Sequence, residues 1–306
     1  MPTALLIEQV LNGLQLGLTL FVMASGLTLV FGVMGLINLA HGSLYMVGAL
    51  VTAYVAGSTG NYWAGLLAGI GAAATLGALV ELSVLRRLYG RGHLDQVLAT
   101  FALILIFSEG ARMIFGAAPL FLNLPEALSG SIALPGGARY PVGRLAIIAV
   151  GIVVAIGLSI LIARTRLGMR IRAGESDREM VAALGVDIAT LYTVVFALGA
   201  ALAGLAGSLV GTIQSVEVGM GEPVLILAFV VIVIGGIGSI RGAFVGALLV
   251  GLVDTIGRIS LPELFGLVME PAAATRVGSG LASMLIYLVM AAILAVRPRG
   301  LFPADA

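Results

Sequence analysis

The chain has 306 residues, of which 60% are hydrophobic and only 10% are charged, and its formal net charge at pH 7 is +1. A water-soluble domain carries roughly 25% charged residues, so this composition excludes a soluble globular fold and indicates an integral membrane protein. Without lysine or cysteine the chain has no Walker A motif, Schiff-base cofactor, thiolate metal site or disulfide, and its 16 arginines form no tract suited to nucleic acid.

Nine apolar segments are candidate membrane helices, since a helix needs about 20 apolar residues to cross a bilayer core. Their predicted bounds are 10–33, 36–56, 62–85, 96–115, 144–163, 190–212, 223–237, 242–259 and 279–296. The first is expected to be an uncleaved helix. Glycine-rich breaks predict that one or two segments are interrupted or re-entrant. We therefore predict an all-α polytopic membrane protein of about eight or nine transmembrane helices, with residues 1–306 as one domain.

Arginines gather after the third, fifth and ninth segments, and the positive-inside rule places such groups in the cytoplasm. The groups are Arg86, Arg87 and Arg91, then Arg164, Arg166, Arg170, Arg172 and Arg178, and finally Arg297 and Arg299. Alternate crossings of all nine segments bring the three groups to one side and place the N-terminus outside. The rule therefore predicts a cytoplasmic loop at 164–189 and an external loop at 116–142.

The predicted cytoplasmic loop mixes charged and apolar residues more than a topological connection requires. The charged side chains that alternate there are Arg170, Arg172, Glu175, Asp177, Arg178 and Glu179. The residues that would supply the apolar face of a short amphipathic helix are Met180, Val181, Leu184 and Val186. This pattern predicts a helix that docks onto a partner protein. A solvated loop that only sets the topology is the alternative.

Residues 32–46, GVMGLINLAHGSLYM, place polar side chains between glycines inside apolar sequence. Polar groups at membrane depth are costly unless they face protein or a wet cavity, and transporters often place their sites at broken helices. The candidate pathway residues here are Asn38, His41, Gly42, Ser43 and Met46. The motif holds no second histidine and no carboxylate, so a metal site is disfavoured, and a structural hydrogen bond from His41 is favoured over a proton relay.

Residues 234–246, IGGIGSIRGAFVG, form a second glycine-rich break. Gly235, Gly236 and Gly238 from this break complete the candidate pathway. The glycines stand between two membrane segments rather than after a strand, so a phosphate-binding loop is disfavoured. They predict a tight junction between two helices, with Arg241 at its cytoplasmic end.

Several segments together resemble the permease subunits of branched-chain amino acid ABC importers, of the LivH-like type within the LivH/LivM family. They are NGLQLGLTLFVMASGLTLVFGV, NLAHGSLYMVGA, LGMRIRAGESDREMVAALGVD, FALGAALAGLAGSL, VVIVIGGIGSIRGAFVGALLVG and RPRGLF. The resemblance covers almost the whole chain. It implies a multi-pass permease of the bacterial inner membrane that moves leucine, isoleucine and valine and is not itself an enzyme.

The same resemblance implies a set of partners. They are a LivM-like permease, two LivG/LivF-like subunits that bind ATP and Mg²⁺, and a periplasmic or extracellular solute-binding protein. The chain itself would hold no cofactor. The implied coupling helix toward the ATPase comprises Glu175, Arg178, Glu179, Ala182, Ala183 and Gly185, beside Arg170 and Arg172. Met180 and Val181 separate Glu179 from the alanines, which departs from the EAA-x3-G pattern of many importer permeases.

Other functions remain as alternatives. Permeases of the same family serve urea, short amides or aromatic acids. An ion-coupled secondary transporter would be expected to show more buried ionisable residues than Glu109 and Asp254, each of which has an arginine within one helical turn. An intramembrane protease is disfavoured because the chain has no H-E-x-x-H motif and only two histidines, His41 and His93.

Overall fold

The computed structural model describes residues 3–134, 137 and 139–302. Its helices are α1 (Thr3–Met34), α2 (His41–Thr59), α3 (Tyr62–Ser83), α4 (His93–Phe115), α5 (Val142–Arg164), α6 (Arg166–Ser176), α7 (Arg178–Ala183), α8 (Ile188–Val210), α9 (Gly221–Gly235), α10 (Ile240–Phe265) and α11 (Pro271–Val296). The other elements are the 3-10 turns η1 (Leu85–Arg87) and η2 (Glu126–Leu128) and the antiparallel strands β1 (Ser131–Ala133) and β2 (Arg139–Pro141). The two ends of the predicted domain and residues 135–136 and 138 of the predicted loop 116–142 lie outside this description.

The predicted all-α membrane architecture is confirmed. The nine predicted segments correspond to α1–α5 and α8–α11. Within the described residues, seven helices are long and apolar enough to cross a membrane, namely α1, α3, α4, α5, α8, α10 and α11. The other two are shorter, with 19 residues in α2 and 15 in α9. Both are continuous helices, so the predicted interruption is not within them but in the residues before each helix begins.

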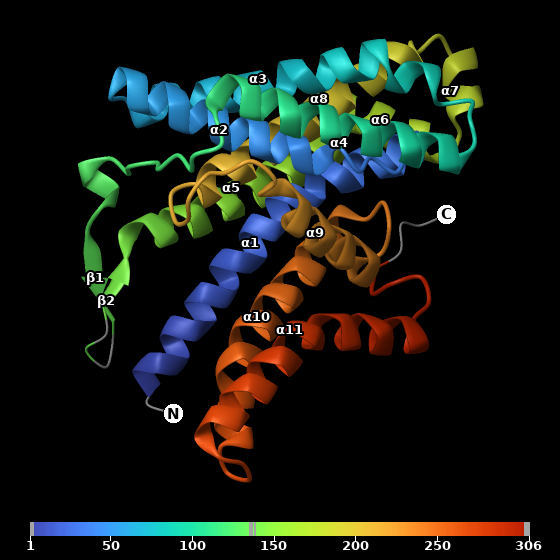
Figure 1. The fold of residues 1–306 in the computed structure, drawn as a ribbon. Helices are drawn as coiled ribbons and strands as arrows, with labels where there is room; N and C mark the ends of the chain where they lie inside the picture. The colour runs from blue at the N-terminus through green and yellow to red at the C-terminus, as the bar shows by residue number, and fades with distance from the viewer. Residues whose placement is uncertain (1–2, 135–136, 138, 303–306) are drawn as a thin grey trace.

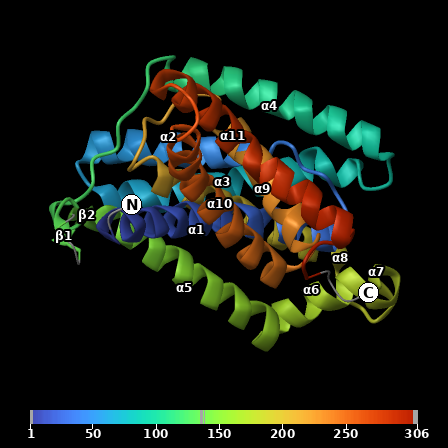
Figure 2. The ribbon, with the colours of Figure 1, turned by 90° about the horizontal axis from the view of Figure 1, so that it is seen from below.

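Helix α8 lies at the centre of the bundle, because glycines let three other helices approach its backbone. The contacts join Gly26 of α1 to Gly199, Gly48 of α2 to Gly204, and Gly77 of α3 to Ala200. A pair of hydroxyls, Thr52 Oγ1 and Ser208 Oγ at 2.7 Å, adds a polar link between α2 and α8. Figure 2 shows α4 and α5 on opposite sides of this core, and α10 packs along α1, where Gly251 lies against the Gly17 backbone.

The two ends of the bundle differ. The hairpin β1–β2 lies at one end and α6 and α7 at the other (Figure 1). We call the second the arginine-rich end, since it carries Arg86, Arg164, Arg178 and Arg297. Arg86 Nη2 reaches the carbonyl of Ala189 there, at 3.4 Å. The opposite end is the hairpin end. The predicted clustering of the arginine groups on one side is thus observed.

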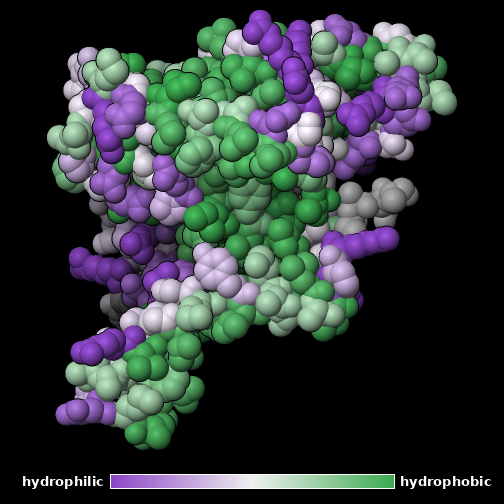
Figure 3. Space-filling model, turned by 45° about the vertical axis from the view of Figure 1, so that its right-hand side comes forward, coloured by the Kyte–Doolittle hydropathy of each residue, from purple (hydrophilic) through white to green (hydrophobic). Residues whose placement is uncertain are grey.

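Helix α1 begins at the hairpin end. Its Asn12 Oδ1 accepts hydrogen bonds from Tyr140 of β2 and from Arg144 of α5, at 3.2 and 2.6 Å. Between the two ends, a hydrophobic band crosses the molecule, with hydrophilic side chains gathered on either side of it (Figure 3). Such a band is what a lipid-facing surface requires.

The C-terminal segment completes the end of α9. The amides of Leu301 and Phe302 donate to the carbonyls of Ile234 and Gly235, at 2.9 and 2.8 Å, and so satisfy groups that a helix end leaves free. Gly300 makes this approach possible. Its φ is +83°, and a β-carbon there would lie 2.6 Å from the Gly236 backbone.

Replacing Gly300 with valine is expected to destabilise the protein, because a β-branched residue is strained at this φ and would also press on Gly236. We expect the Tm of the detergent-solubilised protein to fall by about 3 °C or more. Gly280→Val is the matched control, since Gly280 lies in α11 with no atom near its missing side chain. Equal Tm values for the two variants would contradict the role given to Gly300.

Candidate functional site

Helix α2 begins inside the bundle rather than at its surface. A β-carbon at Gly26 of α1 would lie 3.1 Å from His41 Nε2, so the start of α2 is beside Gly26. Gly26 precedes the end of α1 at Met34 by about 12 Å along the helix axis. The chain therefore turns back between Met34 and His41, through Gly35 with φ +64°, before α2 runs toward the hairpin end.

Helix α9 begins at the same depth. A β-carbon at Gly42 would lie 2.7 Å from the Gly221 carbonyl, which places the first turns of α2 and α9 against each other. The Gly219 amide lies 3.3 Å from Met46 Sδ. From this meeting point α2 and α9 run toward opposite ends of the bundle. Two helices that start together inside a membrane bundle, with free backbone groups at their first turns, are an arrangement on which many transport sites are built.

Buried polar side chains surround this meeting point. Asn38, His41 and Ser43 are at most 5% exposed. The side-chain Oδ1 of Asn38 accepts from the Ala40 amide at 3.0 Å, while Asn38 Nδ2 and His41 Nε2 have no hydrogen-bond partner among the described residues. The structure thus brings the first group of predicted pathway residues together.

The second group lies elsewhere. Gly235, Gly236 and Gly238 stand at the far end of α9, about 20 Å from its start. Gly235 packs directly on the backbone of Gly242, which confirms the predicted tight junction between α9 and α10. Gly236 and Gly238 have φ values of +110° and +84° and turn the chain between these helices. The two predicted groups therefore do not form one site.

The predicted coupling helix is two helices rather than one. Arg170, Arg172 and Glu175 belong to α6, whereas Arg178, Glu179, Ala182 and Ala183 belong to α7, and Gly185 ends the turn after it with φ +87°. The break falls at Asp177, whose extended backbone ends α6 and whose carboxylate accepts from the Met180 amide at 2.9 Å to start α7.

The predicted single apolar face is also wrong. Val181 turns into the protein and is 6% exposed, whereas Met180 and Leu184 are 59% and 77% exposed. The reason is that α7 is too short to present four apolar residues on one side, and its inner face packs on the bundle. Met180 and Leu184 consequently remain exposed to solvent beside charged side chains.

A polar cavity of about 410 Å³ joins the α6–α7 segment to the end of α1. It is lined by Gly32, Val33, Met34, Gly35, Gly174, Glu175, Ser176, Asp177, Arg178 and Glu179. Partial burial of the Glu175 carboxyl here raises its pKa. A β-carbon at Gly32 would lie 3.1 Å from Glu175 Oε1. The end of α1, which leads to the α2 meeting point, is thus in contact with the α6–α7 segment.

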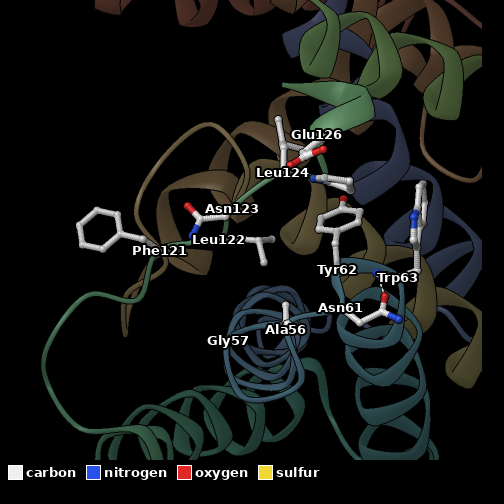
Figure 4. Close-up of a pocket in the computed structure, with 12 residues that line it drawn as sticks. Ala56, Gly57, Asn61, Tyr62, Trp63, Phe121, Leu122, Asn123, Leu124 and Glu126 are labelled. Carbon is white, nitrogen blue, oxygen red and sulfur yellow. Dashed lines mark hydrogen bonds between the residues drawn. The ribbon is translucent and has the colours of Figure 1, made fainter. Parts of the chain in front are cut away.

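A second cavity, of about 540 Å³, opens at the hairpin end (Figure 4). It lies between the α2–α3 turn and residues 121–126, with Tyr62 and Leu122 pointing into the space and Phe121 pointing away from it. Trp63 and Phe121 are 56% and 76% exposed. Sequence reasoning missed this cavity because its two walls are 60 residues apart and their contact follows only from tertiary packing.

Comparison with known proteins identifies the family. The pattern of the family described as "Branched-chain amino acid transport system / permease component" matches residues 9–295. The high-affinity branched-chain amino acid transport system permease protein BraD of Pseudomonas aeruginosa is 32% identical over 266 residues, which cover 82% of this chain and 86% of the relative.

Two further relatives are the permease proteins LivH of Salmonella typhimurium and of Escherichia coli K12, both described as belonging to high-affinity branched-chain amino acid transport systems. Each is 28% identical over 272 residues, covering 82% of this chain and 85% of the relative. No solved structure matches the chain. The chain belongs to the family of branched-chain amino acid transport permeases.

Proposed function

We propose that this permease imports leucine, isoleucine and valine across the bacterial inner membrane, driven by ATP hydrolysis on separate subunits. The observation that carries the proposal is the match of residues 9–295 to the permease family, on a fold whose α2 and α9 start together inside the bundle. The relatives named for branched-chain amino acids support the substrate class. Permeases for urea, short amides or aromatic acids remain the competing candidates.

In this proposal the arginine-rich end is cytoplasmic, as the positive-inside rule predicts. One of the two ATP-binding subunits of the complex then docks on α6 and α7, and these subunits hold the ATP and Mg²⁺. The exposed Met180 and Leu184 support docking at this place, because large apolar side chains in water beside charged ones are typical of a contact surface. The cavity and exposed aromatic residues of the hairpin end would face the solute-binding protein. A LivM-like permease would complete the pathway.

Transport in this scheme needs no covalent chemistry in the permease. Closure of the ATP-binding subunits moves the α6–α7 segment, and the permeases rock between outward- and inward-facing states. The candidate pathway is the meeting point of α2 and α9, with Asn38, His41, Gly42, Ser43 and Met46. The predicted residues Gly235, Gly236 and Gly238 would act at the cytoplasmic end of α9 rather than at the same site.

The test is uptake into proteoliposomes that contain this chain with its partner permease, ATP-binding subunits and solute-binding protein. We expect labelled leucine to accumulate when ATP is inside, and unlabelled isoleucine and valine to compete. Urea, acetamide and phenylalanine serve as competitor controls. Uptake driven by a proton or sodium gradient without ATP would overturn the proposal in favour of a secondary transporter, and competition by urea or phenylalanine alone would reassign the substrate.

A further inference from the structure

Glu81 is a carboxylate buried inside the membrane protein, at the end of α3 and at the arginine-rich end. Its side chain is fully buried, with 0% exposure. Sequence reasoning gave it no role. A charge in this position is costly unless it is paired and hydrogen-bonded, so its partners show what holds it there.

Four hydrogen bonds reach the Glu81 carboxylate. Oε1 accepts from Arg86 Nε at 3.3 Å and from the Tyr89 hydroxyl at 2.7 Å. Oε2 accepts from Arg86 Nη2 at 3.3 Å and from the Thr193 hydroxyl at 2.6 Å. Arg86 and Tyr89 belong to the segment that follows α3, whereas Thr193 belongs to the second turn of α8. The buried carboxylate therefore joins two helices that are about 110 residues apart in sequence.

Arg86 strengthens this link. Its Nη2 also donates to the Thr193 hydroxyl at 2.8 Å and to the Ala189 carbonyl at 3.4 Å. The rings of Tyr89 and Tyr192 meet edge to face, with centroids 5.1 Å apart, and add an aromatic contact between the same two segments. We call Glu81, Arg86, Tyr89 and Thr193 the α3–α8 cluster. It holds the first two turns of α8 against the end of α3.

The α3–α8 cluster lies close to α7 along the chain. Helix α8 begins at Ile188, only five residues after the end of α7, and Asp187 caps it by accepting from the Thr190 amide at 3.2 Å. The Asp187 carboxylate also accepts from the Thr190 hydroxyl at 2.5 Å, and these two hydrogen bonds lower the pKa of Asp187. Any displacement of α7 therefore acts on the first two turns of α8, which Arg86 and Glu81 tie to the end of α3 through the Ala189 carbonyl and the Thr193 hydroxyl.

Helices α3 and α8 are in contact far beyond the cluster. Gly77 packs on Ala200, and a β-carbon at Gly204 would lie 2.5 Å from the Ala73 side chain. Because α8 also contacts α1 and α2 through glycines, movement of α3 and α8 together would carry the walls of the α2–α9 meeting point with it. Loosening of the first turn of α8 would instead absorb the displacement locally.

We propose that the α3–α8 cluster is the mechanical link that transmits movement of the α6–α7 segment to the membrane bundle, with Glu81 as its central positioning residue. This inference rests on the proposed function, since it requires an ATP-driven partner at α7. The four side chains are positioning residues, because none of them lies at the α2–α9 meeting point.

The experiment compares leucine transported per ATP hydrolysed in proteoliposomes of the complete complex. Thr193→Val removes only the hydroxyl that bridges Glu81 and α8. The double variant Glu81→Gln with Arg86→Gln removes both charges together, so that neither is left unpaired. For both we expect the assembled complex and its basal ATPase rate to stay within about two-fold of the unmodified complex, while transport per ATP falls by about five-fold or more. Thr193→Ser keeps the hydroxyl and is expected to restore coupling.

The control is the pair Asp254 and Arg258, which is also an ion pair, at 2.9 Å, but lies within the single helix α10. Its double replacement Asp254→Asn with Arg258→Gln breaks a pair without separating two helices, so the coupling ratio should not change. A coupling ratio of Thr193→Val and of the double variant equal to that of the unmodified complex would overturn the inference. Proportional loss of transport and of assembled complex would do so too, as it marks a purely structural cluster. Absence of ATP-driven uptake in the unmodified complex would instead overturn the proposed function, and this inference with it.

Discussion

Valine in place of Gly48 is expected to prevent the bundle from assembling. Gly48 of α2 lies directly on the backbone of Gly204 in α8, and a β-carbon there would lie 2.7 Å from the Gly204 carbonyl oxygen. Gly204 is also in close contact with Ala73 of α3, so α8 cannot shift away from α2. Overpacking a core commonly costs about 1–3 kcal/mol, and a clash with the backbone of a helix that is itself held in place should exceed the upper value. Such a loss is large against a total stability of about 5–15 kcal/mol.

The measurement is the fraction of expressed protein that elutes as a single sharp peak after extraction in mild detergent, together with its Tm. Gly57→Val is the matched control, because Gly57 lies on the same helix with no atom within 4 Å of its missing side chain. Gly48→Ala should fall between them. If Gly48→Val gives the elution profile and Tm of Gly57→Val, the close approach of α2 to α8 is not needed for folding.

The fold was predictable where composition and hydropathy dominate. All nine apolar segments are helices, because backbone groups in a bilayer must form hydrogen bonds within the segment. The arginine groups lie at one end, as the positive-inside rule requires. Helix ends were less predictable. Helix α1 begins at Thr3 and α10 continues through Pro262 to Phe265, beyond the predicted bounds. Gly278 of α11 packs on the Pro262 backbone, a contact that hydropathy does not indicate.

The site was predictable only in part. The polar residues between glycines indicated the break between α1 and α2, because buried Asn38 and His41 need a protein environment. The sequence carried no signal for the start of α9 beside Gly42, which depends on how residues 211–220 return into the bundle. The three partners of Glu81 come from two segments of the chain, and the sequence indicates only a topological role for Arg86. Arg86 can both mark the cytoplasmic side and pair with Glu81, and only the fold shows the pairing.

Glutamate at Met180 and at Leu184 is expected to detach the ATP-binding subunits without unfolding the permease. Both side chains are exposed, so the free permease loses little stability when they are replaced by glutamate. In the complex, the replacement would remove an apolar contact with the partner and bury a charge, and so lower the affinity. We expect each single variant to weaken association about ten-fold, which corresponds to about 1.4 kcal/mol, and the double variant to weaken it about a hundred-fold. Val181→Glu should behave differently and lower the Tm, because Val181 is buried under α7.

The readout is the amount of ATP-binding subunit that copurifies with the tagged permease and the affinity of the purified parts for each other. Leu267→Glu is the matched control, since Leu267 is 82% exposed but follows α10, which starts beside α9 at the arginine-rich end and runs toward the other end. Its association should equal that of the unmodified chain. If Met180→Glu and Leu184→Glu also retain full association, the partner must bind through the arginines of α6 instead. In that case affinity should fall steeply with added salt, because exposed charge pairs are screened whereas apolar contacts are not.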